Sequence, residues 1–457
     1  MAKRNDIVTG VIEENIFPNK GVMHIDDKPI YITGTFKGQE VKARLFKKKK
    51  GGWEAELKEV ISNPDYFVEP ACKHFGVCGG CTAQSLPYEM QIELKHNQVI
   101  DLLHKAGIEG FEDLGVVSSP EIYEYRNKME YSFGDAEKNG PMTLGMHRKH
   151  STYDVITTDE CKIVDDDYTK IILCILDYCK EHNLPYYHKM SHEGFMRYVV
   201  VRKTKKKGDI LLNIVTSSQM DFEFVELVDI LTKLELKGAI KSVYHTITDT
   251  LADAIKPDKI NLVYGEPEIV ESILGLNFKI SPFSFFQTNS LGAEVLYKNA
   301  LDQIPDLDNK TVFDLYCGTG TITQIMATRA KKVYGIEIVE EAVEKAKENA
   351  KLNGLDNCHF IAGDVLTKID ELTDKPDIIV LDPPREGIHP KAIYKIMNYN
   401  AKELVYISCK PTSLAKDLPI FKEHGYEIQT VQCVDMFPNT PHIETVVRME
   451  RKIKDSK

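Results

Sequence analysis

The sequence contains no apolar run long enough to span a bilayer, and no apolar stretch follows the two basic residues in its first segment, MAKRNDIVTG. Both absences disfavour a membrane protein or a secreted one, so we expect a cytoplasmic protein with no membrane partner. With 42% hydrophobic and 28% charged residues, the composition is that of an ordinary globular chain. Its 457 residues exceed what one core usually holds, and two or three domains are expected.

The sequence also lacks an overall positive charge, since its formal net charge is −11, and this argues against a nucleic-acid partner. The charge is unevenly spread, however, because residues 1–62 hold 12 Lys and Arg against 9 Asp and Glu. Basic residues near an aromatic suit phosphate neutralisation and base stacking, although a solvated turn is the alternative for each cluster alone. The clusters are Lys42, Arg44 and lysines 47–50 beside Trp53, and Arg202, Lys203 and lysines 205–207 in an expected hairpin turn.

Three sections of the chain differ in pattern. Residues 1–63 show short alternating runs separated by glycine-containing turns, which is typical of a small antiparallel β-barrel. Residues 64–275 mix cysteines, helical runs such as YEMQIELKHNQVIDLLHKAG and strand pairs such as FMRYVVVRKT with DILLNIVTSS, which indicates an α+β module. In residues 276–457 strands and helices alternate, which predicts an α/β domain with a mostly parallel sheet.

The last section carries a nucleotide-cofactor pattern. The run TVFDLYCGTGTITQIMATRA reads as a strand, a turn containing Asp314, Gly318 and Gly320, and a helix, and small residues there let the backbone approach a ligand. Glu337 ends the next strand, where an acid meets ribose hydroxyls, and Asp364 follows the third, where it suits an adenine edge. The turn lacks the dinucleotide glycine spacing, and no Gly-Lys-Ser/Thr follows it, so S-adenosylmethionine fits better than NAD or ATP. We therefore predict a Rossmann-like methyltransferase domain whose last two strands, joined by a short turn, are antiparallel.

Two turns that carry candidate reactive residues are expected at the same edge of this sheet. In enzymes that methylate exocyclic amines, an aromatic follows a comparable Asp-Pro-Pro and stacks on the base, whereas Asp382-Pro-Pro-Arg385 has an arginine there. Methylation at carbon is therefore favoured. C5 of a uracil becomes nucleophilic once a thiolate adds to C6, and Cys409 is the candidate for that addition. We expect Lys410 and a helix beginning near residues 411–413 to lower its pKa.

Removal of the C5 proton needs a base, and Glu444 in PHIETVV is the candidate because it interrupts an otherwise apolar strand. The alternatives are a buried structural thiol for Cys409 and a solvated strand-end carboxylate for Glu444. Asp382 and Arg385 are expected to position the base or the methyl donor. Arg126 and Lys128 are candidate RNA contacts, and a plain surface strand is the alternative.

A cysteine cluster lies in the middle section. Cys72, Cys78 and Cys81 form C-x5-C-x2-C with glycines between them, and sets of four thiolates suit iron-sulfur clusters or zinc. The fourth thiolate has three candidates, because Cys161 lies in a polar loop while Cys174 and Cys179 lie in an amphipathic helix and suit packing better.

Along the chain occur, in this order, FSFFQTNS, DLYCGTGT, the strand-ending Glu337, LDPPREG, YISCKPTSL and PHIETVV. In order and spacing they resemble the RNA (uracil-5-)-methyltransferases of the RumA and TrmA type, and the resemblance covers nearly the whole chain. It implies S-adenosylmethionine contacts at Gln287, Tyr316, Glu337 and Asp382, a nucleophile at Cys409 and a proton acceptor at Glu444. Phe285 or Phe286 would then stack near the target base or the cofactor.

The resemblance is closest to the RumA-like branch that acts on 23S ribosomal RNA. In that branch an N-terminal TRAM domain binds RNA, and the fourth ligand of a 4Fe-4S cluster occupies the position matching Cys161. The expected partner is therefore RNA, and the protein is expected to act as a monomer. Three alternatives remain: a uridine C5-methyltransferase of transfer RNA, a cytosine methyltransferase that would need a second thiol on the Pro-Pro turn, and a non-catalytic RNA-binding or redox-sensing protein.

Overall fold

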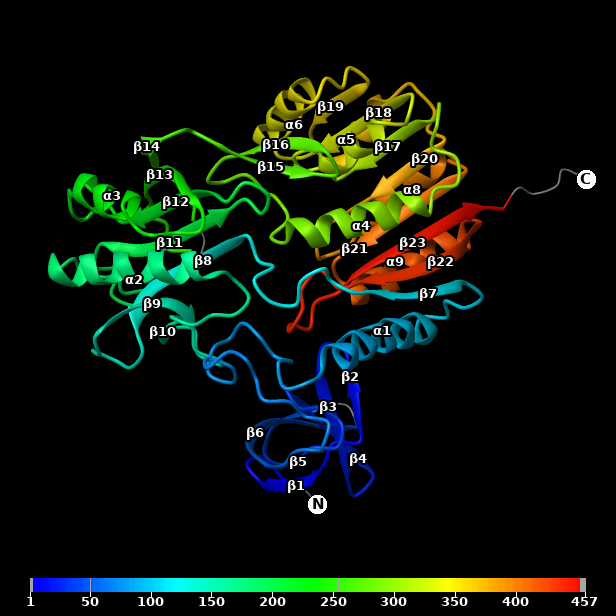
Figure 1. The fold of residues 1–457 in the computed structure, drawn as a ribbon. Helices are drawn as coiled ribbons and strands as arrows, with labels where there is room; N and C mark the ends of the chain where they lie inside the picture. The colour runs from blue at the N-terminus through cyan, green and yellow to red at the C-terminus, as the bar shows by residue number, and fades with distance from the viewer. Residues whose placement is uncertain (1–2, 50, 253–254, 453–457) are drawn as a thin grey trace, which may run out of the picture.

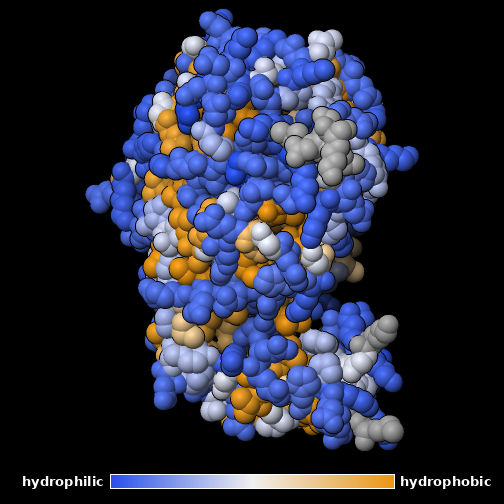
Figure 2. Space-filling view, turned by 90° about the vertical axis from the view of Figure 1, so that its right-hand side faces the viewer, coloured by the Kyte–Doolittle hydropathy of each residue, from blue (hydrophilic) through white to orange (hydrophobic). Residues whose placement is uncertain are grey.

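Figure 1 shows the computed structural model, which describes residues 3–49, 51–252 and 255–452. Lys50, a member of the first lysine cluster, lies outside the described residues, as do the first two residues of the chain. Within these ranges no helix is long and apolar enough to cross a membrane. The N-terminal sheet forms the lowest lobe of the molecule, and Figure 2 shows a face on which hydrophilic residues separate the apolar ones.

Residues 7–62 form one six-stranded sheet with the spatial order β1-β5-β6-β4-β3-β2. β1 and β2 are consecutive in the chain yet lie at opposite edges, so the sheet curls around a core that includes Ile12, Ile32 and Val41. Its pairs are antiparallel except β4 with β6, so the expected all-antiparallel barrel is instead a curled sheet with one parallel pair. The strands are β1 (Ile7–Val11), β2 (Glu14–Ile16), β3 (Lys20–Ile25), β4 (Lys28–Thr33), β5 (Glu40–Lys49) and β6 (Gly52–Ser62).

The central section contains a seven-stranded sheet of order β10-β9-β8-β11-β12-β13-β14. As the sequence predicts, β11 pairs with β12 antiparallel, so lysines 205–207 lie in the connecting turn. The helices α2 and α3 contribute Ile171, Ile175 and Leu227 to the core on this sheet. The elements are β8 (Lys128–Asp135), β9 (Met142–His147), β10 (Val155–Thr157), α2 (Asp166–Glu181), β11 (Met196–Lys203), β12 (Asp209–Thr216), α3 (Val225–Thr232), β13 (Ala239–Ile247) and β14 (Lys259–Gly265).

The C-terminal section builds an eight-stranded sheet of order β19-β18-β17-β20-β21-β23-β22-β7. β17 to β21 run parallel, and β23 is antiparallel to both neighbours, which confirms the predicted terminal hairpin. Two elements precede the sheet, the hairpin β15 (Ile269–Ile273) and β16 (Leu276–Ile280), and the helix α4 (Ser290–Asp302). The strands are β17 (Thr311–Leu315), β18 (Lys332–Glu337), β19 (Cys358–Ala362), β20 (Ile378–Leu381), β21 (Glu403–Ser408), β22 (Tyr426–Val434) and β23 (Glu444–Arg451). The helices are α5 (Thr321–Ala327), α6 (Glu340–Leu352), α7 (Val365–Lys368), α8 (Pro390–Asn398) and α9 (Pro411–Glu423), with a short 3-10 turn, η1 (Ile369–Glu371).

One helix and one strand of the expected central section pack with this sheet. β7 (Glu112–Val117) pairs with β22 in parallel and forms the sheet's edge, and α1 (Tyr88–Lys105) buries Val99 and Leu103 against Leu414 and Phe421. Figure 1 shows α1 and β7 beside β22 and α9. The domain boundaries at residues 63 and 275 stay a prediction, and residues 88–117 lie with the C-terminal core although they precede the second boundary.

Candidate active site

The residues singled out from the sequence gather at one edge of the eight-stranded sheet. Parallel strands present their carboxyl ends at a common edge, and an antiparallel neighbour presents its amino end there. Five of these residues end or follow the parallel strands β17 to β21, and one begins β23. In the order of these strands they are Tyr316, Glu337, Asp364, Asp382, Cys409 and Glu444.

Cys409 and Glu444 face each other across this edge. Ser408 pairs with Thr445 in the antiparallel ladder, so the next position in register places Cys409 opposite Glu444. Glu444 is 4% exposed, so the alternative of a solvated carboxylate is wrong. Burial raises its pKa to about 7, and Arg385 opposes that rise.

The thiol of Cys409 differs from the expectation. The helix α9 begins at Pro411 as predicted, but the pKa of Cys409 is raised to about 11 by burial and by the charges of Glu444 and Asp382. Arg385, rather than Lys410, is the basic side chain that lowers it. The sequence-based prediction of a depressed pKa is therefore wrong, because the sequence revealed neither the burial of the sulfur nor the two carboxylates near it.

A second group of acids lies behind these residues. Burial, then Glu444 and Asp314, raise the pKa of Asp382 well above its usual range. Asp314 is fully buried and accepts from Thr323 Oγ1 at 2.5 Å, while its Oδ1 has no hydrogen-bond partner. The Gln287 side chain hydrogen-bonds to the buried Tyr297, whose raised pKa reflects burial first and Asp382 next. The site is therefore rich in carboxylates and suited to a cationic ligand.

Arg385 is held by a histidine that the sequence did not single out. Its Nη2 lies 3.2 Å from His442 Nδ1, and the Arg385 carbonyl accepts from Ser413 Oγ at 2.7 Å. Burial, then Arg385, lower the pKa of His442 to about 4, so at neutral pH the imidazole is uncharged and accepts from the guanidinium. Arg385 in turn lowers the pKa of both Cys409 and Glu444, so this pair supplies the positive charge near the two reacting groups.

The other end of the site has the form of a nucleoside cradle. Glu337 accepts from the Gly318 backbone N–H at 3.1 Å and from the Val339 N–H at 3.0 Å, which fixes its carboxylate at the mouth of the glycine-rich turn. Gly318 has φ +53, and a Cβ there would meet only Phe285 at 4.0 Å, so the turn has an open side. Phe285 is exposed and Phe286 is buried, so Phe285 is the phenylalanine available to a ligand.

The acids around this cradle fit S-adenosylmethionine, which carries a sulfonium, an amine and two ribose hydroxyls. Glu337 and the half-buried Asp382 can accept from or balance these groups, whereas the exposed Asp364 accepts from Leu366 N at 2.9 Å as the cap of α7.

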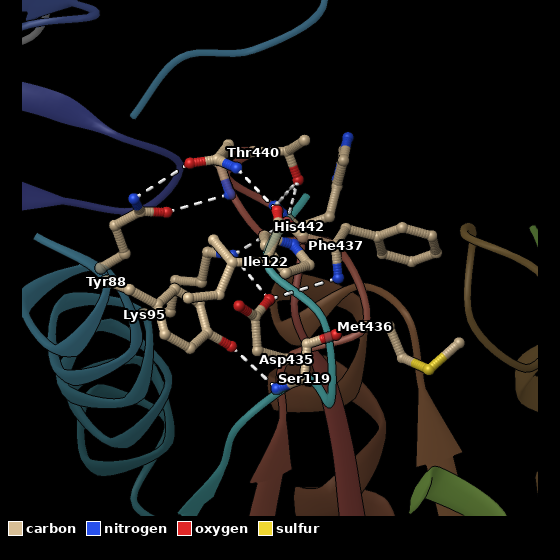
Figure 3. A network of polar contacts seen from close by, with 12 residues as sticks. Tyr88, Lys95, Ser119, Ile122, Asp435, Met436, Phe437, Thr440 and His442 are labelled. Atoms are coloured by element: carbon tan, nitrogen blue, oxygen red, sulfur yellow. Dashed lines mark hydrogen bonds and ion pairs between the residues drawn. The ribbon is translucent and has the colours of Figure 1, made fainter. Parts of the chain in front are cut away.

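The segment that leads into Glu444 is fixed from the other end of the chain (Figure 3). Lys95 on α1 donates to Asp435 Oδ1 at 2.7 Å and to the Phe437 carbonyl at 3.1 Å, and both charged side chains are buried. Gln91, one turn earlier, exchanges two hydrogen bonds with Asn439, at 2.9 and 3.1 Å. Residues 435–442 are therefore attached to α1, and α1 positions His442 and Glu444.

Breaking this buried ion pair should be costly. Lys95→Met leaves Asp435 buried without a counter-charge, and we expect the free energy of unfolding to fall by about 3–5 kcal/mol. Lys95→Met combined with Asp435→Asn should recover part of that loss, because no lone charge remains. Urea unfolding measures both, with Lys298→Met at the exposed pair with Asp302 as the matched control, expected within about 0.5 kcal/mol of the unmodified protein. Equal losses in the single and double variants would contradict the expected dominance of the unpaired charge.

The four predicted cluster cysteines surround one cavity. Cys72, Cys78, Cys81 and Cys161 line a space of about 450 Å³, which also reaches Thr288 and His442. Burial first, and the other thiols of the set, raise the pKa of Cys81 to about 12 and of Cys161 to about 11. Cys174 and Cys179 lie on α2 and do not line it, in agreement with their expected packing role.

Within the described ranges, no three histidine, cysteine or carboxylate side chains are arranged to hold a single metal ion. Zinc needs four ligands converging on one point. As a donor set, four thiols suit either zinc or an iron-sulfur cluster.

Comparison with known proteins shows the family. A methyltransferase-domain family model matches residues 306–447. An uncharacterized RNA methyltransferase from Clostridium acetobutylicum is 50% identical to the chain, over 99% of this chain and 99% of the relative. Another, from Caldanaerobacter subterraneus subsp. tengcongensis, is 49% identical, over 99% of this chain and 100% of the relative. The chain belongs to the RNA methyltransferases.

Among solved structures, the Pyrococcus abyssi tRNA (uracil-54, C5)-methyltransferase in complex with S-adenosyl-L-homocysteine has a TM-score of 0.79 at 25% identity, over 97% of this chain and 100% of that one. The methyltransferase thus has the S-adenosylmethionine-dependent fold predicted from its sequence.

Four contributors to the site could not be singled out from the sequence. Tyr297 and Lys95 lie on helices where their neighbours suggest ordinary faces, and His442 carries no signal apart from its place two residues before Glu444. Asn127 is the fourth, and it donates to the Gln287 carbonyl at 3.0 Å and to Ser290 Oγ at 2.7 Å. The neighbouring residues Arg126 and Lys128 line the cysteine cavity, so they do not lie on a plain surface strand.

Proposed function

We propose that this methyltransferase transfers a methyl group to C5 of a uridine in RNA through a covalent bond between Cys409 and C6 of the base. The observation that carries the proposal is the pairing of Cys409 with the buried Glu444 across adjacent strand ends, with Arg385 acting on both. Carbon methylation of a pyrimidine needs a nucleophile and a base on one site. The P. abyssi enzyme, named for this reaction on tRNA, shares the architecture over 97% of the chain.

S-adenosylmethionine supplies an electrophilic methyl group to this site, where Glu337, Asp382 and Gln287 would hold it. The chain's own residues handle protons and the covalent bond. The thiol of Cys409 loses its proton to Asp382, which leaves Glu444 ionised for the later step, and adds to C6, with Arg385 balancing the charge. After methylation at C5, Glu444 takes the C5 proton, and the electrons of that bond expel the thiolate to restore the free enzyme.

The class of RNA is a finer part of the proposal. We propose 23S ribosomal RNA, which the four-cysteine cavity supports, with transfer RNA as the second candidate. The P. abyssi tRNA enzyme aligns with 97% of this chain, so the N-terminal sheet by itself does not distinguish an enzyme of ribosomal RNA from one of transfer RNA. We further propose that the protein acts in the cytoplasm as a monomer.

We also propose that Cys72, Cys78, Cys81 and Cys161 hold a 4Fe-4S cluster. Protein purified without oxygen is expected to contain iron and acid-labile sulfide, and Cys81→Ser or Cys161→Ser should lose most of both. Cys174→Ser is the matched control, because this thiol is also half-buried but lies on α2 outside the cavity. Elemental analysis that found zinc in place of iron, or full iron content in Cys161→Ser, would refute the assignment.

The function is tested with RNA in which 5-fluorouridine replaces uridine. Fluorine at C5 cannot be removed as a proton, so a protein–RNA adduct that survives denaturation is expected with S-adenosylmethionine present. Mapping 5-methyluridine in ribosomal and transfer RNA from cells with and without the protein then decides the substrate class. If no adduct forms and no 5-methyluridine is lost, the proposal fails and a non-catalytic RNA-binding protein becomes the better description.

A further inference from the structure

A second cavity, of about 270 Å³, lies beside the turn between β11 and β12. Six basic side chains line it with two carboxylates, Glu124 and Asp165. Four of the six make ion pairs: Lys203 with Asp165 and Asp167, Lys205 with Glu121, Lys206 with Glu294, and Lys237 with Asp166. Among the described residues, the two lining cations outside these pairs are Arg126 and Lys207. Tyr168 also lines it; this residue is only 1% exposed, and its hydroxyl oxygen is buried without a hydrogen-bond partner. The backbone N–H of Lys203, which lies near that oxygen, donates instead to the Asn127 carbonyl at 2.9 Å.

The turn that carries these lysines is fixed in place. Gly208 N–H donates to the Thr204 carbonyl at 3.1 Å, and Asp209 N–H donates to Thr204 Oγ1 at 2.9 Å. The Lys205 N–H donates to Glu271 of β15 at 2.7 Å, and Lys206 pairs with Glu294 of α4 at 2.7 Å. The turn is therefore attached to the methyltransferase domain, and lysines on a fixed turn bind an anion with less loss of conformational entropy.

The cavity also adjoins the active site. Asn127 lines it and donates to the carbonyl of Gln287 at 3.0 Å. Arg126 lines both this cavity and the cysteine cavity, whose wall includes His442, the partner of Arg385. Positive charge is concentrated between the two cavities, because the buried Arg202, which has two nitrogens without partners, lies opposite Lys128 in the sheet. Lys128 pairs with Glu130 at 2.5 Å, and burial first, then Arg202, lower its pKa.

We propose that this second cavity is a phosphate-binding subsite for the RNA strand that flanks the methylated uridine. A phosphodiester would face Lys207 and Arg126 and would accept a hydrogen bond from Tyr168, which otherwise has no partner. Extruding a base from its stack requires a grip on the flanking backbone, and this subsite lies beside the segment that carries Gln287. The inference rests on the proposal that RNA is the substrate, and it adds where the strand is held.

The test uses fluorescein-labelled oligouridylate of about 20 nucleotides and measures its dissociation constant by anisotropy over a range of KCl concentrations. In single strands each lost phosphate contact lowers the slope of log affinity against log salt by about 0.7. K205A/K206A/K207A should reduce that slope by roughly 1–2 and weaken binding several-fold. K298A/K310A/K347A is the charge-matched control, because each of these lysines pairs with an acid within four residues and lines neither cavity.

Tyr168→Phe removes only the hydroxyl and should weaken oligouridylate binding a few-fold without lowering the melting temperature. A purely structural tyrosine would show the opposite, an altered melting temperature with unchanged binding. The proposal is overturned if the lysine variant keeps the slope of its control, or if Tyr168→Phe binds RNA as tightly as the unmodified protein. The binding measurements test the subsite separately from the methylation of uridine. If the protein binds RNA through this cavity but forms no 5-fluorouridine adduct, the subsite is supported and the proposed function fails.

Discussion

Cys409→Ala is expected to abolish methyl transfer to RNA, with a loss on the order of 10⁴-fold or more in kcat, because the variant has no group that can add to C6. The structure makes this loss specific to chemistry. Cys409 directly follows β21 and is half-buried, so removing one sulfur should leave the sheet intact. Binding of S-adenosyl-L-homocysteine, measured by calorimetry, should change less than about threefold, since the proposed cofactor contacts lie on other strands.

The matched control is Cys358→Ala, which removes another half-buried thiol from the same sheet, on β19. It should keep most of the methyl transfer and should still form an adduct with 5-fluorouridine RNA, whereas Cys409→Ala should form none. A Cys409→Ala protein that still makes 5-methyluridine would end the covalent mechanism, whatever its rate.

The raised pKa of Cys409 bears on how the reaction starts. At a pKa of about 11, imposed by burial and by Glu444 and Asp382, the thiol is protonated in the free protein. A resting thiolate would be open to oxidation, so a protonated sulfur protects the nucleophile until substrate is bound. Any proton acceptor for the thiol must then be one of the carboxylates that raise its pKa. Arg385, held by His442, is the charge that can stabilise the thiolate once it forms.

The sequence predicted which residues lie at the candidate active-site edge of the sheet. Each of these residues ends, follows or begins a strand, and the ends of strands can be located from the apolar pattern. Tyr316, Glu337, Asp382, Cys409 and Glu444 could all be placed in this way. The pKa of Cys409 could not be predicted in this way, since it depends on the burial of the thiol and on two carboxylates from other strands. Long-range partners were equally hidden: Lys95 and Asp435 are 340 residues apart in the chain.

The place of β7 in the fold was hidden from the sequence for the same reason. β7 is a six-residue strand, EDLGVV, without a pattern that favours one sheet over another, and only its pairing with β22 assigns it to the eight-stranded sheet. The N-terminal sheet was predicted as antiparallel because its turns are short, but the longer connection between β4 and β6, which passes through β5, permits a parallel pair.

Glu444→Gln is expected to trap the enzyme on ordinary uridine RNA. The amide fills the same space but cannot take the C5 proton, so the thiolate cannot leave and the methylated adduct should accumulate as a protein–RNA band on a denaturing gel. Loss of a general base costs about 10²–10⁴-fold in kcat. Glu427→Gln, on the neighbouring strand β22 and paired with Lys452 at 2.6 Å in solvent, is the matched control and should turn over normally.

The pH dependence supplies an independent check, because the base acts only when ionised. Since burial raises the pKa of Glu444 to about 7, turnover by the unmodified protein should rise as pH increases through about 7. Stability should move the other way. A carboxylate whose folded pKa lies above its unfolded value of 4.5 stabilises the fold while protonated, and that contribution is lost as pH rises through about 7. Glu444→Gln keeps a neutral group at every pH, so its melting temperature relative to the unmodified protein should increase from pH 5 to pH 8. A difference that stayed constant over this range would mean that Glu444 is already ionised at pH 5, and a base with an ordinary pKa would then have to replace the one proposed.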